Sequence, residues 1–251
     1  QLVLSRRFKQ KFSGDEFNVY RALRSINPSP YLFFFDYGDF KIFGSSPEAQ
    51  IIIKDGKSEI HPIAGTFKRT GNDEEDQKTA KELAEDPKEN SEHIMLVDLA
   101  RNDLSRSGNN VKIEKNREVQ FYSHVIHLVS KVTSILKENI KSFQVVEDTF
   151  PAGTLSGAPK HKALELIEKY EKVNRNFYGG AIGYIDFNGN FNHAIIIRSF
   201  FSKNNVLNYQ AGAGIVIDSI PEKELEEVKN KLGALDKALE EAEKIKWKRF
   251  F

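Results

Sequence analysis

Two glutamates stand on a helical face that otherwise carries apolar side chains. Glu89 and Glu92 are three residues apart, and the same face continues through Leu96 and Leu99. Carboxylates that point toward a core are unfavourable unless protons or a cation neutralise them. This pair is therefore a candidate set of metal ligands.

A second pair with the same spacing lies near the C-terminal end of the chain. Glu224 and Glu227 adjoin Leu225 and Val228, and Lys231 follows Glu227 one helical turn later. Two helices that each offer such a pair could share one hard cation, and oxygen ligands favour Mg²⁺. Glutamate is usually exposed, so two solvated helix flanks with ion pairs explain the same spacing. Spacing alone favours this plainer interpretation.

Glycine-rich turns and one arginine form a candidate anion site. Residues 211–214 (AGAG) and 151–159 (PAGTLSGAP) let backbone N–H groups approach an anion closely. Arg198 follows the apolar residues 193–197, where a guanidinium can bind a carboxylate through two hydrogen bonds. Each feature alone equally fits an ordinary turn or a charge at a strand end, and none matches a nucleotide-binding fingerprint.

Two further residues are candidates for the functional site, although neither belongs to a pair or to a glycine-rich turn. His127 shares a strand face with Val125 and Val129, where a hydrogen-bonded core histidine is the commoner explanation. Glu48 follows a strand at a tight turn, and alone it indicates nothing.

Composition narrows the classes of function. The 251 residues carry 37 basic and 36 acidic side chains, which argues against binding to nucleic acid or to a membrane surface. The absence of cysteine excludes disulfides and thiolate metal sites. No apolar run reaches the roughly 18 residues of a membrane helix, so we expect a cytoplasmic protein.

The elements that position these residues are strands in hairpins with helices between them. Asp55-Gly56 and Asn188-Gly189 are typical hairpin turns, so the flanking strands are expected to be antiparallel and the fold class to be α+β. The expected strands are residues 31–35, 40–43, 51–54, 57–63, 119–133, 180–187, 190–201 and 206–210, and the expected helices are 73–85, 88–106, 158–172 and one beginning near Pro221 with Leu225, Val228, Leu232, Leu235 and Leu239 as its apolar stripe.

Taken together, the ordered motifs of this chain resemble the chorismate-utilising enzyme family. They cover most of the sequence: GSSPE (44–48), PIAGT (62–66), ENSEHIMLVDLARNDLSR (89–106), YSHVIHLVS (122–130), FPAGTLSGAPK (150–160), YGGAIGY (178–184), AIIIRS (194–199) and QAGAGIVIDSIPEKELEE (210–227). The resemblance implies two large antiparallel β-sheets packed together with helices outside, in a single catalytic domain over residues 1–251. We expect an N-terminal regulatory region to be absent, because the chain starts at Gln1 and Met95 is its only methionine.

The resemblance also implies a role for each candidate. Glu92 and Glu227 would hold Mg²⁺ on the ring carboxylate of chorismate, with Glu89 and Glu224 supporting the metal. Glu48 would be the general acid at the departing hydroxyl, and His127 would serve the loss of pyruvate. The enolpyruvyl carboxylate would be held by Arg198, Tyr178 and the amides of Gly212 and Gly214, with Thr154, Thr66 and Lys231 nearby.

Two positions distinguish reactions within the family. Members that attack with water carry a lysine near the position of Gln1, and aminodeoxychorismate synthases typically carry a nucleophilic lysine in place of Ala64. Glutamine and alanine here favour amination by free ammonia and loss of pyruvate, which gives anthranilate in the first committed step of tryptophan biosynthesis. A glutamine amidotransferase subunit is the implied ammonia source. The alternatives are aminodeoxychorismate, isochorismate or salicylate synthesis, and a catalytically silent, metal-stabilised binding module.

Two segments relate to the family in other ways. Asn27, Pro28, Ser29 and Tyr31 resemble part of its feedback site for tryptophan, although NPSPY is also an ordinary proline-rich loop. Residues 67–69 (FKR) depart from the basic-proline pair that usually follows PIAGT, and the sequence offers no reason for the departure.

Overall fold

The computed structural model describes residues 1–122 and 125–245, apart from the side chain of Thr66. The chain forms two compact units. Unit 1 comprises residues 1–48, 155–182 and 194 onward, and unit 2 comprises residues 49–154 and 183–193. The expectation of a single catalytic domain stays a prediction.

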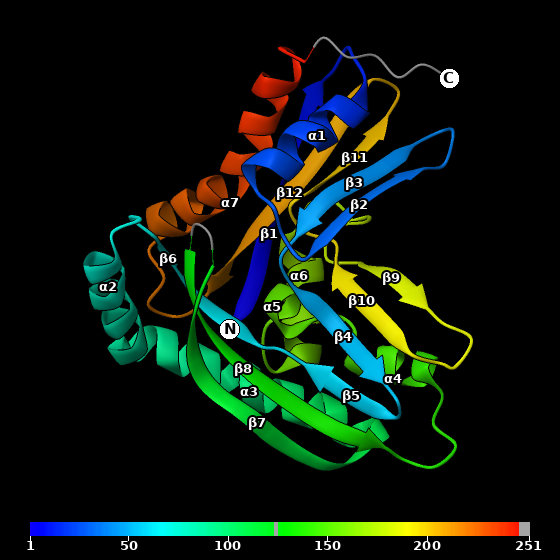
Figure 1. Ribbon diagram of the computed structural model, residues 1–251, viewed down its shortest axis with the longest axis vertical. Helices are drawn as coiled ribbons and strands as arrows, with labels where there is room; N and C mark the ends of the chain where they lie inside the picture. Colours follow the sequence, from blue (N-terminus) through cyan, green and yellow to red (C-terminus); the bar gives the residue numbers. More distant parts are fainter. Residues whose placement is uncertain (123–124, 246–251) are drawn as a thin grey trace. The chain divides into compact units, whose positions relative to one another are not determined.

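Unit 1 is built on a five-stranded antiparallel sheet with two helices on one face (Figure 1). The strand order is β1 (Leu2–Lys11), β12 (Val206–Ile215), β11 (Ser199–Lys203), β3 (Lys41–Ser46) and β2 (Tyr31–Asp36). The covering helices are α1 (Glu16–Ile26), whose N-cap Asp15 accepts the N–H of Phe17 at 2.8 Å, and α7 (Pro221–Ala242). Alternate residues of the strands pack against these helices in a core that includes Leu23, Phe43, Phe200, Leu207, Val228, Leu232 and Leu235.

Unit 2 is built on a seven-stranded sheet. Its order is β6 (Ile63–Lys68), β8 (Val125–Leu136), β5 (Lys57–Ile60), β4 (Ala49–Lys54), β10 (Phe191–Ile195) and β9 (Ala181–Ile185), and β7 (Gly108–Phe121) also pairs with β8. Helices α2 (Asp73–Glu85), α3 (Pro87–Ser107) and α4 (Ser142–Thr149) pack on the sheet. The core beneath them includes Ile51, Ile53, Leu83, Val97, Leu104, Ile126, Leu128, Val132 and Val145.

Two short helices complete the chain. The single-turn α5 (Gly153–Ser156) leads to α6 (Lys160–Tyr170), which packs against β1. Gly157 between them has φ +106°, and a Cβ there would lie 2.3 Å from the carbonyl oxygen of Gln1. Glycine is therefore required for the close approach of the TLSG segment to the start of β1.

The expected α+β class with two antiparallel sheets is confirmed, whereas the packing of the sheets against each other stays a prediction. The single strand expected over residues 119–133 is wrong, because β7 ends at Phe121, β8 begins at Val125 and the two strands pair antiparallel. The single strand over residues 190–201 is also wrong, because the chain leaves β10 after Ile195 and starts β11 at Ser199. Among the described residues, no helix is both long and apolar enough to span a bilayer.

Candidate functional site

The break between β10 and β11 places Arg198 in an unusual backbone conformation. Its φ is +50°, in the left-handed region that arginine rarely occupies. The neighbouring GSSPE motif supports this kink. The N–H of Ser45 donates to the carbonyl oxygen of Arg198 at 3.1 Å. A Cβ on Gly44 would lie 2.5 Å from the Cβ of Ser199, so only glycine lets β3 come this close.

Close to this break between β10 and β11, a carboxylate and a phenol lie near the Arg198 side chain. Burial lowers the pKa of the Arg198 guanidinium, while the neighbouring Tyr178 and Glu48 side chains act in the opposite direction. The backbone of Glu48 is fixed from both sides. Its carbonyl oxygen accepts the N–H of Ile195 at 3.0 Å, and its own N–H donates to the Ser46 hydroxyl at 3.4 Å. Unit 1 therefore brings the expected general acid and the expected anion-binding arginine together.

Tyr178 links Arg198 to the glycine-rich strand. Burial raises the pKa of Tyr178, although Arg198 and a backbone hydrogen bond from Gly212 act to lower it. The phenol therefore stays protonated and can donate its O–H. Gly212 lies tightly against β1, where a Cβ would meet the carbonyl oxygen of Leu4 at 2.7 Å. Gly214 follows two residues later on the same face of β12.

Helix α7 adds a cation and two carboxylates to this side of unit 1. The ammonium of Lys231 donates to the carbonyl oxygen of Gly212 at 2.8 Å and forms an ion pair with Glu227. Glu224 lies one helical turn before Val228 in α7. This glutamate is only 7% exposed. No hydrogen bond or ion pair joins its carboxylate to another described residue. The expectation of carboxylates at the margin of the apolar stripe holds for Glu224, whereas Glu227 is nearly half exposed.

In unit 2 the candidates gather around the backbone of the PIAGT motif. The pairing of β6 with β8 is interrupted by a bulge between Ala64 and Phe67, and Gly65 has φ +67°. A Cβ on Gly65 would lie 2.5 Å from Leu83 and 3.1 Å from the Oε2 atom of Glu89. Leu83 therefore occupies the space that the missing side chain leaves open, and the carboxylate of Glu89 lies beside it.

His127 contacts the same glycine. Its Nδ1 atom is 2.7 Å from the carbonyl oxygen of Gly65, and its ring lies edge-on to Tyr122 with centroids 5.4 Å apart. A carbonyl oxygen can only accept, so Nδ1 carries the proton and Nε2 of the neutral ring keeps the lone pair. Ile126 and Leu128 on the opposite face are buried in the core. This tautomer gives His127 the capacity of a general base.

The donor set fits a hard divalent cation, although the arrangement of the four glutamates stays a prediction. Glu89 and Glu92 belong to unit 2, and Glu224 and Glu227 belong to unit 1. Within either unit, no three acidic or histidine side chains of the described residues form a group that could hold a metal. The all-oxygen donor set is what Mg²⁺ prefers, and Glu224 is only 7% exposed.

The remaining sequence candidates are placed as follows. Thr154 lies in α5, and the side chain of Thr66 lies outside the described part of the structure. Asn27 ends α1, and its carbonyl oxygen accepts the buried Ser45 hydroxyl of the GSSPE motif. Its side-chain amide donates to Ser29 at 3.4 Å. The expected feedback segment, which also contains Pro28 and Tyr31, is thus joined to β3 within unit 1.

Two arginine–carboxylate pairs were not predicted from the sequence. Arg69 of the unexplained FKR segment binds the buried Asp76 through its Nε atom at 2.7 Å, which accounts for the basic residue there. Arg175 binds Glu171 in a bidentate pair close to Tyr178. The only signal for the second pair is an i,i+4 spacing, which is also typical of exposed helix surfaces.

Residues 1–237 match the family model described as chorismate binding enzyme. This chain belongs to the chorismate-binding enzyme family. Among curated family members, anthranilate synthase component 1 of Aquifex aeolicus is 48% identical over 245 residues, which are 97% of this chain and 50% of that protein. The protein of the same name from Bacillus subtilis is 47% identical over 97% of this chain and 48% of its own length. The chain thus spans about half the length of these relatives.

Solved structures of the family agree with this assignment. Anthranilate synthase component I from Streptococcus pneumoniae has 42% identity and a TM-score of 0.86, covering 93% of this chain and 52% of that one. The menaquinone-specific isochorismate synthase from Escherichia coli has 26% identity and a TM-score of 0.87, covering 95% and 56%.

Proposed function

We propose that this chain is the catalytic part of an anthranilate synthase component 1, which converts chorismate and ammonia into anthranilate, pyruvate and water. The observation that carries the proposal is the cluster of Tyr178, Arg198 and Glu48 in unit 1 of a chain that is nearly half identical to proteins of that name. Isochorismate synthases share the family, so the reaction rests on the higher identity and on two residues discussed below.

Chorismate is a dianion, and the cluster offers groups for one of its carboxylates. Arg198 supplies a guanidinium fork and Tyr178 an O–H donor, and the backbone beside Gly212 and Gly214 approaches without side chains. Lys231 adds a second positive charge at the Gly212 carbonyl. Because burial weakens hydration of Arg198, its attraction for an anion is stronger than that of an exposed arginine.

The residues assigned to Mg²⁺ are Glu92 and Glu227, with Glu89 and Glu224 in support. When bound, Mg²⁺ would neutralise these carboxylates and polarise the ring carboxylate of chorismate. The low exposure of Glu224 supports this assignment, because a carboxylate that is largely removed from water is stabilised by a nearby cation.

The chemistry divides between the two units. Ammonia attacks C2 as the C4 hydroxyl leaves, and Glu48 donates the proton that lets this group depart as water. In the second step Nε2 of His127 accepts the proton from C2, and the bond between C3 and the enolpyruvyl oxygen breaks. The ring becomes aromatic and enolpyruvate takes up a proton to become pyruvate. The Nδ1 proton bound to Gly65 supports this role for Nε2.

Ammonia is the proposed nucleophile. Ala64 is 7% exposed in β6 and has no amine that could attack the ring, and Gln1 cannot act as the base that would activate water. The implied source is a glutamine amidotransferase partner in the cytoplasm. Feedback by tryptophan through residues 27–31 is the corresponding proposal for regulation.

The test is to incubate the chain with chorismate, MgCl₂ and an ammonium salt and to follow anthranilate fluorescence, with product identity checked by chromatography. We expect anthranilate and pyruvate in equal amounts, with a rate about 10³-fold lower for the Arg198→Met variant. Aminodeoxychorismate or isochorismate as product would assign the chain to another branch of the family. Chorismate binding without turnover would support a silent module instead.

A further inference from the structure

A buried ion pair between Glu171 and Arg175 lies a few residues before Tyr178 in the chain. Arg175 donates to both carboxylate oxygens of Glu171, through Nε at 2.9 Å and Nη2 at 2.6 Å. Only 18% of the arginine side chain and 7% of the glutamate side chain are exposed. Two parallel hydrogen bonds fix the plane of the guanidinium as well as its position.

The pair also ties three separate segments of unit 1 together. Arg175 donates to the carbonyl oxygen of Leu155 in the TLSG segment at 2.6 Å and to that of Val3 in β1 at 2.7 Å. Glu171 accepts both the N–H of Ser5 at 2.8 Å and its hydroxyl at 2.7 Å. Each charge therefore has full hydrogen-bonding compensation, which is the condition for a buried ion pair to be rigid.

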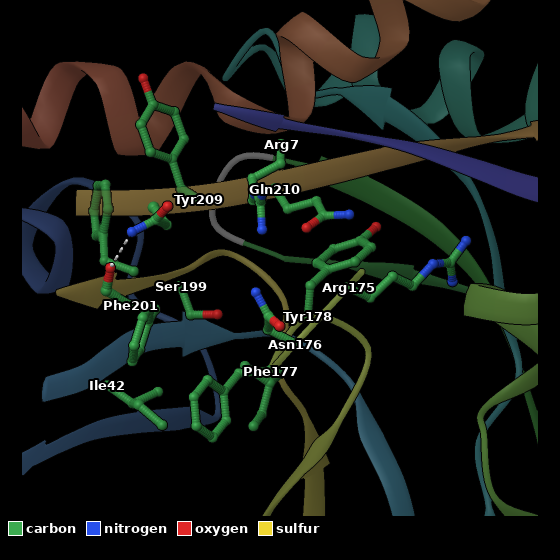
Figure 2. Close-up of a pocket in the computed structure, with 13 residues that line it drawn as sticks. Arg7, Ile42, Arg175, Asn176, Phe177, Tyr178, Ser199, Phe201, Tyr209 and Gln210 are labelled. Carbon is green, nitrogen blue, oxygen red and sulfur yellow. Dashed lines mark hydrogen bonds between the residues drawn. The ribbon is translucent and has the colours of Figure 1, made fainter. Parts of the chain in front are cut away.

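The fixed guanidinium then defines the place of the Tyr178 ring. Its Cζ atom lies 5.8 Å from the ring centroid, within the range of a cation–π contact. The N–H of Tyr178 donates to the carbonyl oxygen of Arg175 at 3.0 Å, so backbone and side chain are both held. In Figure 2, Arg175 and Tyr178 lie next to each other at the end of the pocket opposite Ile42.

We propose that Arg175, held by Glu171, is a positioning residue that aims the Tyr178 hydroxyl at the substrate carboxylate. The inference rests on the proposed function, because that function supplies the substrate carboxylate that Tyr178 would bind. Ser5 extends the arrangement to β12, since its hydroxyl accepts from the Gln210 amide at 2.7 Å, two residues before Gly212. The Glu171–Arg175 pair thus aligns the tyrosine and the glycine-rich strand with respect to the same point on β1.

The first test is Arg175→Lys, which keeps the positive charge but cannot form the bidentate fork. We expect the KM for chorismate to rise about tenfold with kcat within about threefold, because ground-state positioning is lost while the acid and base are untouched. Glu171→Gln should act in the same direction. The matched control is Arg69→Lys, which breaks the comparable Arg69–Asp76 pair of unit 2. It should lower Tm to a similar extent and leave KM within about twofold.

The second test asks whether Arg175 acts through Tyr178. In a Tyr178→Phe background the hydroxyl is already absent, so Arg175→Lys should raise KM by less than about twofold further. Effects on KM that multiply would show a purely structural role and overturn the inference. So would an unchanged KM for Arg175→Lys in an active protein. If the wild type neither turns over nor binds chorismate, measured calorimetrically with Mg²⁺, the proposed function fails and the inference falls with it.

Discussion

Units 1 and 2 each carry part of the candidate site, but they hold their residues in different ways. In unit 1 side chains hold one another, as in the contacts that join Lys231 to Glu227 and Arg175 to Glu171. In unit 2 side chains gather around a backbone bulge, where His127 and Glu89 both contact Gly65. We therefore expect unit 1 to be sensitive to loss of charge and unit 2 to be sensitive to gain of a methyl group.

Because of this difference, we expect the two units to respond differently to single substitutions. Removal of one charge from a side-chain network leaves its buried partner without a hydrogen bond, which is costly. A bulge with positive φ at one glycine responds to added bulk instead, because any Cβ strains the backbone and meets Leu83. Four predictions test this contrast.

The largest effect is expected from Arg198→Met in unit 1. Removal of the guanidinium takes away the main cation of the proposed anion site, and activity should fall about 10³-fold. The decrease should appear in kcat/KM for chorismate, measured by anthranilate fluorescence. Arg198→Lys is the control that keeps the charge, and it should recover part of the loss. A methionine variant with more than about a tenth of wild-type activity would remove Arg198 from the site.

Gly65→Ala should have the next largest effect, and on unit 2. Left-handed backbone and contact with Leu83 together should lower the free energy of unfolding by about 2–4 kcal/mol. Thermal unfolding measures this change in the free energy of unfolding. Gly233→Ala is the matched control, because Gly233 lies in α7 with open space around its Cα. That substitution should raise stability by up to about 1 kcal/mol through helix propensity. Equal stability of the two variants would contradict the role of the bulge.

Lys231→Met tests the side-chain network of unit 1 with a smaller expected effect. Without the ammonium, Glu227 loses a competing cation, so the Mg²⁺ concentration for half-saturation should fall about threefold. Calorimetric titration with MgCl₂ measures this directly. Lys229→Met is the control, because among the described residues Lys229 forms its ion pair with the exposed Glu226 of the same helix. A rise in the half-saturating concentration would mean that Lys231 assists metal binding.

The smallest effect concerns His61 in unit 2. Burial lowers the pKa of His61, although Glu59 at 3.2 Å acts in the opposite direction. The folded protein binds a proton at this histidine less readily than the unfolded chain, which takes one up below about pH 6.5, so acid destabilises the fold there. His61→Gln should reduce the fall in Tm between about pH 7.5 and about pH 5.5 by about 1–2 °C. The comparison variant is His161→Gln, which removes an exposed histidine of α6.

Local signals predicted much of the fold. The helix over residues 73–85 was predicted at its observed bounds, and the Asp55-Gly56 turn joins two antiparallel strands as expected. These features depend on residues that are close in sequence, where capping and turn chemistry decide the outcome. The end of β7 at Phe121 and the start of β8 at Val125 were missed because no Gly or Pro interrupts the sequence there.

The geometry of the site depends on contacts between distant residues, and the sequence contains little trace of them. The kink at Arg198 exists because Gly44 and Ser45 on another strand accommodate it. Likewise, the Glu171–Arg175 spacing resembles an ordinary surface pair until β1 covers it. The motifs therefore indicated which residues belong to the site, whereas the partners that hold them emerged only from the fold.

The kink at Arg198 has a consequence for laboratory evolution. A left-handed backbone and a desolvated guanidinium both oppose folding at this position. Replacement of Arg198 by glycine would relieve both, so the variant should melt at a higher temperature while its catalysis is lost. A library screened for heat resistance alone would therefore discard this arginine early, and screens of this chain need turnover as a second criterion.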